Sequence, residues 1–372
     1  MVNISHCAAY WQPVIDALQK HFHDPDIESA HIVCAAIAAH CLNGVPVWPM
    51  VIAPPGSGKT ELVGSFEGLA HVHLIDTLTP KTFISGQIDD PTHKRTTSAS
   101  LLQRIGANGI IICPDFSTIT AIKHDARVQI LADMRRIYDG ALSKEFGTDN
   151  NLRDRTWKGR ITFAAAATPD IDRHHGMSQA LGERFIITRL PRPNGIQAAR
   201  RALNQNKNQM KHDLQDAVHR LMNHSEKGVE PTVPARLQDQ IAALTEYSVR
   251  ARTYVHRDRS AKKLIEYIPI PEAPTRMAQQ LTQLMKGGAK LAGRCVVDDT
   301  DYRLAVRAAF DSIPPARLKI LESLRTNNPE HASALPDSTR SYAKEELKIL
   351  ELLTSDFLSE LASELLKQAK LL

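Results

Sequence analysis

Residues 51–60 constrain the fold of this chain more than any other part of its sequence. They read as an apolar strand, a loop that contains Gly56 and Gly58, and a Lys-Thr pair that opens a helix. The two glycines allow backbone conformations in which successive N–H groups converge on one anion. This strand–loop–helix order is the Walker A phosphate loop in its expected context, so it predicts an α/β fold that binds a nucleotide.

The residue types of the loop suit a triphosphate and its metal ion. Lys59 is expected to reach the outer phosphates, and the helix that begins near it adds its positive end. The hydroxyl of Thr60 suits the Mg²⁺ ion that accompanies the nucleotide. Ala53, a small residue, stands where the motif has its first glycine. The predicted nucleotide-binding residues are Pro55, Gly56, Ser57, Gly58, Lys59, Thr60 and Glu61.

Two further apolar strands lead to polar residues that suit the same site. Strand 109–113 leads to Asp115, and strand 161–167 leads directly to Thr168. Because the carboxyl ends of parallel strands face the ligand crevice, both side chains are expected beside the phosphate loop. Asp115 is predicted to join the magnesium shell or to polarise the attacking water, and Thr168 to bind that water or the γ-phosphate. An Asp at this position also suits a helix cap ahead of Ser117.

The pattern of elements divides the chain into four parts. Residues 1–45 have helical periodicity, and residues 46–195 alternate strands with helices, which predicts a parallel sheet with helices on both faces. Residues 196–312 carry only helical patterns, and two prolines after Ile313 introduce the last part, residues 313–372. The predicted strands cover residues 47–53, 72–75, 109–113, 161–167 and 185–190.

Composition argues against membrane-spanning and disulfide-stabilised proteins. No apolar run approaches the roughly 18 residues that would span a bilayer, and the N-terminus lacks the order of a secretory signal. The five cysteines have no zinc-ligand spacing, and their odd number argues against a disulfide framework. These features predict reduced thiols in a cytoplasmic protein without a membrane partner.

A short basic stretch lies between residues 250 and 263, where six cations face the single acid Asp258. Such a stretch suits phosphate-bearing partners, and it equally suits a solvated helix face. Both interpretations stay open at this point. The cations are Arg250, Arg252, Arg257, Arg259, Lys262 and Lys263.

Two features flank the strand 161–167. Residues 138–147 and 152–157 read as two strands of a hairpin directly before it. Arg184 follows it at a helix-to-strand junction, from which it can reach the nucleotide of a neighbouring subunit. In this order the parts resemble the AAA+ ATPases, and most closely the branch typified by minichromosome-maintenance replicative helicases, which carries a pore hairpin before the fourth strand. The resemblance covers roughly residues 46–310.

This resemblance implies a protein that binds and hydrolyses ATP with Mg²⁺, assembles into a ring of six or seven copies (a hexamer or heptamer), and acts on DNA as a helicase, translocase or loader. It implies a P-loop AAA+ core at 46–195, an all-α lid at 196–312 and a C-terminal helical segment that is winged-helix-like or oligomerising. Arg184 matches the arginine finger. Arg276, in the lid, matches the second sensor, acting in cis or in trans. The implied catalytic residues are Asp115, Thr168, Arg184 and Arg276, with Thr60 and Asp115 at the metal.

The hairpin, residues 141–158, is expected to project into the pore of such a ring. Positive side chains there would follow a nucleic-acid backbone, and Lys144 is the first choice for a strand contact. An exposed hairpin of mixed charge is the alternative. The predicted nucleic-acid residues are Lys144, Arg153, Arg155 and Lys158.

One departure from the family pattern concerns the acids beside the nucleotide. The family has an Asp-Glu pair, one acid for magnesium and one for water, whereas Pro114 and Asp115 supply a single acid here. A single acid favours slow hydrolysis. The alternative function is therefore an ATP-dependent assembly switch or scaffold that recruits partner proteins.

The last part of the chain predicts helices at 316–325 and 337–353. The polar run 338–342 opens the second helix, and the pair is compatible with a helix-turn-helix that reads the major groove. No β-wing is predicted after it. Residues 356–372 instead read as an amphipathic helix that suits packing or oligomerisation.

Overall fold

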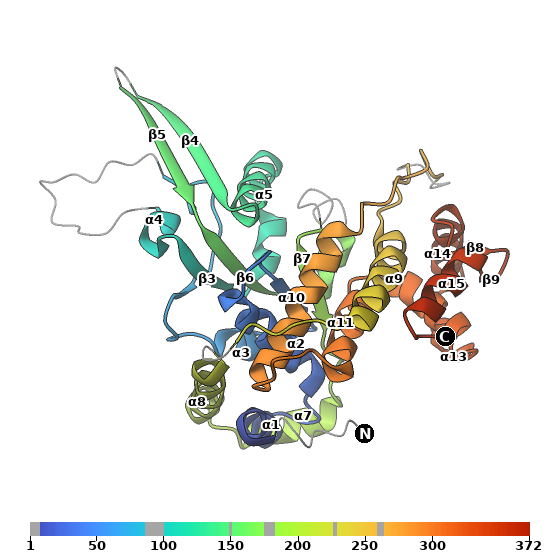
Figure 1. The fold of residues 1–372 in the computed structure, drawn as a ribbon, viewed down its shortest axis with the longest axis horizontal. Helices are drawn as coiled ribbons and strands as arrows, with labels where there is room; N and C mark the ends of the chain where they lie inside the picture. The colour runs from blue at the N-terminus through green and yellow to red at the C-terminus, as the bar shows by residue number, and fades with distance from the viewer. Residues whose placement is uncertain (1–7, 86–99, 149–150, 175–182, 226–228, 259–263) are drawn as a thin grey trace, which may run out of the picture.

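A computed structural model of the chain describes residues 8–85, 100–148, 151–174, 183–225, 229–258 and 264–372. Its centre is a sheet of five parallel strands in the order β2-β3-β6-β1-β7 (Figure 1). The prediction of an α/β fold with a parallel sheet is confirmed. The strands are β1 (Trp48–Ile52), β2 (Val72–Leu74), β3 (Asn108–Cys113), β6 (Arg160–Ala167) and β7 (Phe185–Arg189).

Helices cover both faces of the sheet, which explains why its strands are almost continuously apolar. Alternate residues of a strand point to opposite faces. Val51 and Ile112 therefore join one hydrophobic core, whereas Met50 and Ile111 join the other. The first core includes α2 (Ile27–Ala38) and α3 (Lys59–Gly64), and the second includes α4 (Leu101–Ile105) and α5 (His124–Tyr138).

The N-terminal helices share the first core with the helices that follow the sheet. Helix α10 packs along α2, and a Cβ on Gly287 would lie 2.0 Å from the carbonyl oxygen of Ala35. Helix α8 packs on α1, where Asp213 and His21 form a hydrogen bond of 2.8 Å. These helices are α1 (Ala8–His21), α8 (Lys207–Ser225), α9 (Ala235–Arg252), α10 (Thr275–Leu291) and α11 (Asp299–Asp311), whereas α7 (Gly195–Leu203) lies outside this core with no buried residue.

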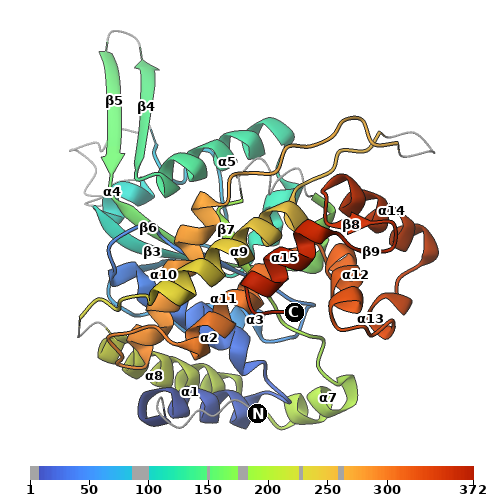
Figure 2. The same cartoon turned by 45° about the vertical axis from the view of Figure 1, so that its right-hand side comes forward.

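The predicted hairpin forms between α5 and β6. Strands β4 (Ala141–Thr148) and β5 (Asn151–Lys158) pair in antiparallel fashion. Figures 1 and 2 both show this hairpin projecting beyond the rest of the molecule. Its root is packed, because Leu142 and Trp157 are buried and the indole N–H of Trp157 donates to the carbonyl of Gly106 (2.6 Å).

The C-terminal segment contains a small hairpin that the sequence did not predict. Strands β8 (Leu353–Thr354) and β9 (Phe357–Leu358) pair where no β-wing was expected, and the last helix, α15 (Glu360–Gln368), begins only after them. The expected single helix over 356–372 is therefore wrong at its start, because Ser359 caps α15 by accepting from Ala362 N–H. The preceding helices are α12 (Pro315–Arg325), α13 (Glu330–Ser333) and α14 (Asp337–Ile349).

Candidate functional site

The loop between β1 and α3 has the backbone that its glycines predict. Gly56 and Gly58 have φ of +77° and +82°, the left-handed region that favours glycine. Gly58 also lies against Phe22, where a Cβ would be 2.6 Å from Cε1 of the ring. The Oγ atom of Ser57 is buried and has no hydrogen-bond partner in the described part of the chain. An orphaned hydroxyl of this kind fits a loop whose remaining partner is a ligand.

Lys59 is the first residue of α3 and is only 8% exposed. Among the described residues, none forms an ion pair or a hydrogen bond with its ammonium group. Buried lysines are normally paired, because withdrawing a charge from water is costly. The loop thus ends at a largely buried lysine without an internal counter-charge among the described residues. Thr60 and Glu61 follow it as exposed residues of the first turn.

Asp115 and Thr168 lie at the same edge of the sheet as the phosphate loop. In the register of β1 and β6, Ile52 is paired with Ala167, so Thr168 begins where the loop begins. Strand β6 lies between β1 and β3, and Asp115 follows β3. The polar Thr168 is therefore positioned between the phosphate loop and the acid.

Ser117 connects the acid to the threonine, and sequence reasoning missed it. Its Oγ accepts from the N–H of Thr168 (2.8 Å) and lies 3.2 Å from Oγ1 of that residue. Its own N–H donates to Oδ1 of Asp115 (3.2 Å), so Asp115 caps η2 (Phe116–Ala121) while its side chain stays exposed. The predicted capping role is present. A hydroxyl two residues after the strand-end acid was the available signal.

Three titratable side chains in or beside the sheet are withdrawn from water: Cys113 of β3 is buried, and His31 and His40 are half-buried. Burial lowers the pKa of His31 and of His40 to about 4, and neighbouring positive charges add to this effect. Burial also raises the pKa of Cys113 to about 12, so its thiol is protonated at neutral pH.

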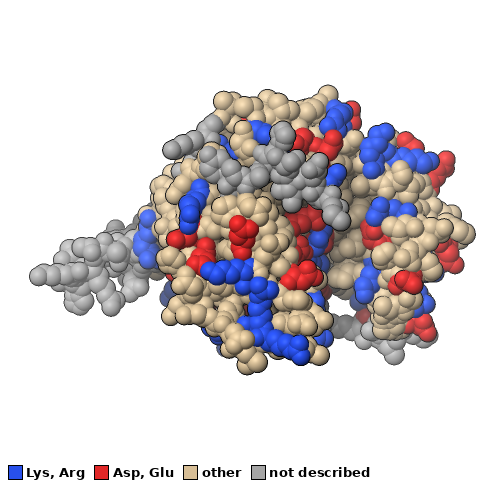
Figure 3. Space-filling view, turned by 90° about the horizontal axis from the view of Figure 1, so that it is seen from below, with Lys and Arg blue, Asp and Glu red and all other residues tan. Residues whose placement is uncertain are grey.

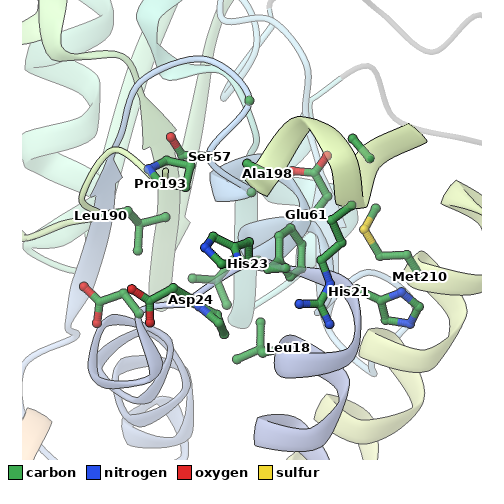
Figure 4. A pocket seen from close by; sticks show the side chains of 18 of the residues that line it. Leu18, His21, His23, Asp24, Ser57, Glu61, Leu190, Pro193, Ala198 and Met210 are labelled. Carbon is green, nitrogen blue, oxygen red and sulfur yellow. The ribbon is translucent and has the colours of Figure 1, made fainter. Parts of the chain in front are cut away.

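A cavity of about 160 Å³ lies beside the phosphate loop (Figure 4). Pockets for whole ligands usually measure roughly 300–1,000 Å³, so this volume suits one part of a ligand, such as a heteroaromatic base. Gly56, Ser57, Gly58 and Glu61 of its walls were predicted from the sequence, whereas the wall residues before and after the region of the loop and α3 were not, because they come from distant segments. The apolar wall includes Leu18, Phe22, Leu190, Pro193, Ala198 and Met210, and His21, His23, Asp24 and Gln205 supply polar groups.

The surface around this edge carries no broad basic field. Figure 3 views the side of the molecule that bears α1, α7 and α8, and Lys and Arg side chains there are interspersed with Asp and Glu. The unpaired positive charge described at this edge is therefore the local one of Lys59.

Arg184 lies at the opposite edge of the sheet. Phe185, the next residue, is paired with Trp48 at the start of β1, whereas the phosphate loop follows its end. The length of β1, about 13 Å at roughly 3.3 Å per residue, separates the two. Arg184 is 6% exposed and pairs with Asp139 (3.0 Å). Burial lowers the pKa of Arg184, and its pairing with Asp139 opposes that effect.

Arg276 lies at the same edge as Arg184. It pairs with Glu272 (3.8 Å), and its positive charge is one of the influences that lower the pKa of Arg184. Helix α10 fixes this arrangement, because Nε2 of its buried Gln280 donates to the carbonyl of Arg184 (2.6 Å). The two arginines predicted for the γ-phosphate are thus together, and both are remote from the loop of their own chain.

The hairpin cations have different surroundings. Lys144 forms an ion pair with Asp133 of α5 and donates to the carbonyl of Pro80 (3.0 Å). Arg155 donates to Oε1 of Gln103 (3.2 Å). Lys158 is exposed, and the side chain of Arg153 lies outside the described part. The placement of Lys144 does not fit its predicted role as first strand contact, and contact through the hairpin stays a prediction.

The basic stretch is engaged within the chain wherever it is described. Arg250 pairs with Glu246 and Glu351, Arg252 with Glu272, and Arg257 with Glu345 and Glu346. These residues therefore form neither an open phosphate site nor a solvated helix face. Arg259, Lys262 and Lys263 lie outside the described residues.

The polar groups at the start of α14 are also partly engaged. Arg340 donates to the carbonyl of Leu335 (2.9 Å), and the guanidinium of Arg257 lies over the ring of Tyr342, 4.7 Å from its centre. Ser338 and Ser341 remain exposed. The residues expected to read a DNA groove are thus divided between internal and exposed positions.

Comparisons with known proteins return no relatives: no protein-family model matches the chain, and no curated protein matches it either. Within the residues that the structure describes, no helix combines the length and the apolar character needed to cross a bilayer. No group of three or more His, Cys, Asp or Glu side chains suited to a metal ion occurs in that same part.

Proposed function

We propose that this chain is an AAA+ ATPase that binds ATP at residues 53–60 and completes its catalytic site with a second copy of itself in a ring. The observation that carries the proposal is Lys59, a residue only 8% exposed whose ammonium has no partner among the described residues, at the end of a loop with two left-handed glycines. A triphosphate supplies the counter-charge that this position otherwise lacks. The adjoining cavity, about 160 Å³ in volume, suits its base.

The residues at the loop fit ATP with Mg²⁺. Lys59 and the loop N–H groups would bind the phosphates, and Ser57 of the loop and Thr60 of α3 would offer hydroxyl groups to them. Thr60 and Asp115 offer oxygen ligands, the type that Mg²⁺ prefers, and a bound Mg²⁺ would neutralise phosphate charge. Thr168, tied to Ser117, would orient the attacking water.

The positions of Arg184 and Arg276 support completion of the site by a second copy. Neither arginine can reach the loop of its own chain, because the sheet separates them from it. An arginine lent by a neighbour stabilises charge on the transferring phosphoryl group and accelerates such reactions by about 10³–10⁵-fold. We therefore assign both arginines to the trans side of the site.

Action on DNA is supported by the hairpin, which projects from the body (Figure 2) and has the exposed Lys158 at its root, paired with Ala141. A projecting hairpin in a ring would track a strand through backbone contacts. The C-terminal segment adds less support, since Arg340 and Tyr342 have internal contacts.

A second function, an ATP-dependent assembly switch that recruits protein partners, is favoured by one specific feature. Asp115 is the single acid at the strand end, and one of its oxygens already caps η2. A site with one partly engaged acid suits slow hydrolysis. Turnover with and without a single-stranded DNA oligonucleotide discriminates: strong stimulation supports the motor, and background turnover with ATP-driven assembly supports the switch.

Mixing two inactive variants tests the shared site directly. Lys59→Ala should lose nucleotide binding, and Arg184→Ala should bind ATP but lose turnover. A mixture of the two should regain turnover, because some seams then combine an intact loop with an intact arginine. Mixing Lys59→Ala with itself in the same total amount is the control. Full turnover by Arg184→Ala alone would refute the trans assignment.

A further inference from the structure

Asp139 is the acid that engages Arg184 within one subunit. Both of its carboxylate oxygens accept from Nη2 of Arg184, at 3.1 and 3.0 Å. The guanidinium carbon lies 5.3 Å from the centre of the Tyr138 ring. The side chain of Arg184 is 7% exposed and that of Asp139 is 46% exposed. The arginine is thus turned into its own subunit, and the acid faces outward.

The same helix end leads into the hairpin. Asp139 ends α5, and Gly140, with φ of +88°, turns the chain into β4. One and a half turns earlier on α5, Asp133 pairs with Lys144 of that strand. Asp133 of α5 and Asp139, its C-cap residue, therefore pair with two of the cations that the sequence assigned to partners outside the subunit, Lys144 and Arg184.

The acid of this pair can be approached from outside. Asp139 lines a cavity of about 670 Å³ together with Gly44, Pro46, Arg160 and Gln279. A triphosphate offers several anionic oxygens, and a guanidinium binds phosphate as readily as carboxylate, with paired hydrogen bonds. Carboxylate and triphosphate are therefore alternative partners for one guanidinium.

We propose that Asp139 is a positioning residue that retains Arg184 in the separate subunit and yields it to the triphosphate of a second copy on assembly. This inference rests on the proposed function, since it presupposes that Arg184 acts in trans. Assembly then exchanges one charge-assisted pair for another. Removing the Asp139 charge removes the competitor, so it favours the assembled, active state.

The test measures ATP turnover against protein concentration for Asp139→Asn and for the unmodified chain. The variant should reach half-maximal turnover at a protein concentration about fivefold lower, the factor that corresponds to about 1 kcal/mol for a partly exposed ion pair. Asp139→Glu, which keeps the charge, should restore the original concentration. Asp125→Asn, the same change at an exposed position of α5, is the matched control and should leave the curve unchanged.

The outcomes separate this inference from the proposed function. If Arg184→Ala abolishes turnover while the Asp139→Asn curve coincides with that of the unmodified chain, only the role of Asp139 is refuted. If Arg184→Ala retains full turnover, the trans site fails and the inference with it. A lower turnover of Asp139→Asn at every concentration also refutes it. Asp139→Ser removes the same charge and gives the same test should the Asn variant not fold.

Discussion

Replacing Lys144 by Met tests whether this residue stabilises the fold or contacts a bound DNA strand. Its ammonium pairs with Asp133 and donates to the carbonyl of Pro80 (3.0 Å), and the two ionic side chains are 13% and 9% exposed. Met keeps an unbranched stem of similar length and removes only the charge and the donors. The change therefore isolates the ion pair between the hairpin and α5.

The expected cost follows from the burial of both groups. Removing one partner of a buried ion pair costs about 3–5 kcal/mol, because the other charge is left uncompensated. Residual exposure of this pair, and the apolar packing that Met retains, reduce this to about 2–3 kcal/mol. Burial raises the pKa of Asp133, and Lys144 opposes that rise. Without Lys144 the carboxyl protonates more easily, so the cost should be smaller at pH 5 than at pH 7.

Urea unfolding followed by circular dichroism measures this cost for Lys144→Met, Asp133→Asn and the double variant. The double variant should lose less than the sum of the single losses by at least about 1 kcal/mol, since the two residues form one interaction. The reasoning is refuted if Lys144→Met unfolds at the original urea concentration. If the variant then also lowers the slope of log affinity for DNA against log salt concentration by about one unit, Lys144 contacts the DNA strand instead.

Two further predictions concern the loop and the response to acid. Gly58→Ala should cost about 1–2 kcal/mol in backbone strain and weaken nucleotide binding, since the new Cβ meets Phe22 at 2.6 Å. Gly64→Ala, with open space around its Cβ, should bind as before in the same fluorescent-nucleotide titration, and equal binding by both variants would contradict the argument. Burial lowers the pKa of His40 to about 4 in the folded state, from its ordinary value of 6.5. As the pH falls, the unfolded state therefore binds a proton at His40 before the folded state does. Stability should therefore fall as the pH drops from 6.5 to 4, by about 3 kcal/mol for this residue, and pH-dependent unfolding of His40→Gln should show a shallower fall.

The sheet and the phosphate loop were predictable because local sequence determines them. The strands β1, β3 and β6 are apolar on both faces, so their residue types alone predict that they are buried, whatever elements pack against them. The left-handed φ of Gly56 and Gly58 is likewise a requirement of the loop itself. Each of these features depends on a short stretch of chain.

The partners of the cations were not predictable, because they are distant in sequence. The sequence analysis assigned Lys144 to a bound DNA strand and Arg184 to the nucleotide of a neighbouring subunit. In the folded chain, however, Lys144 pairs with Asp133 of α5 and Arg184 pairs with Asp139, the C-cap residue of that helix. Arg257 pairs with Glu345 and Glu346 of α14. A charge count shows how many cations lie in a stretch, but only the tertiary structure shows which of them are already paired.

The parallel sheet also limits how a complete site can be assembled. All its strands run in one direction, so the phosphate loop after β1 and the arginine before β7 must lie at opposite edges. Each copy would therefore present Arg184 from one surface and accept the Arg184 of another copy at a different surface, beside its phosphate loop. A contact between two different surfaces of identical chains is a heterologous contact. Such contacts close into a ring when the rotation between copies divides a full turn, and otherwise continue as a filament. Asp139 and the hairpin both lie at the C-terminal end of α5. The rotation between neighbouring copies that would bring a neighbour's triphosphate to Arg184 would therefore also determine the direction of the hairpin in the assembly.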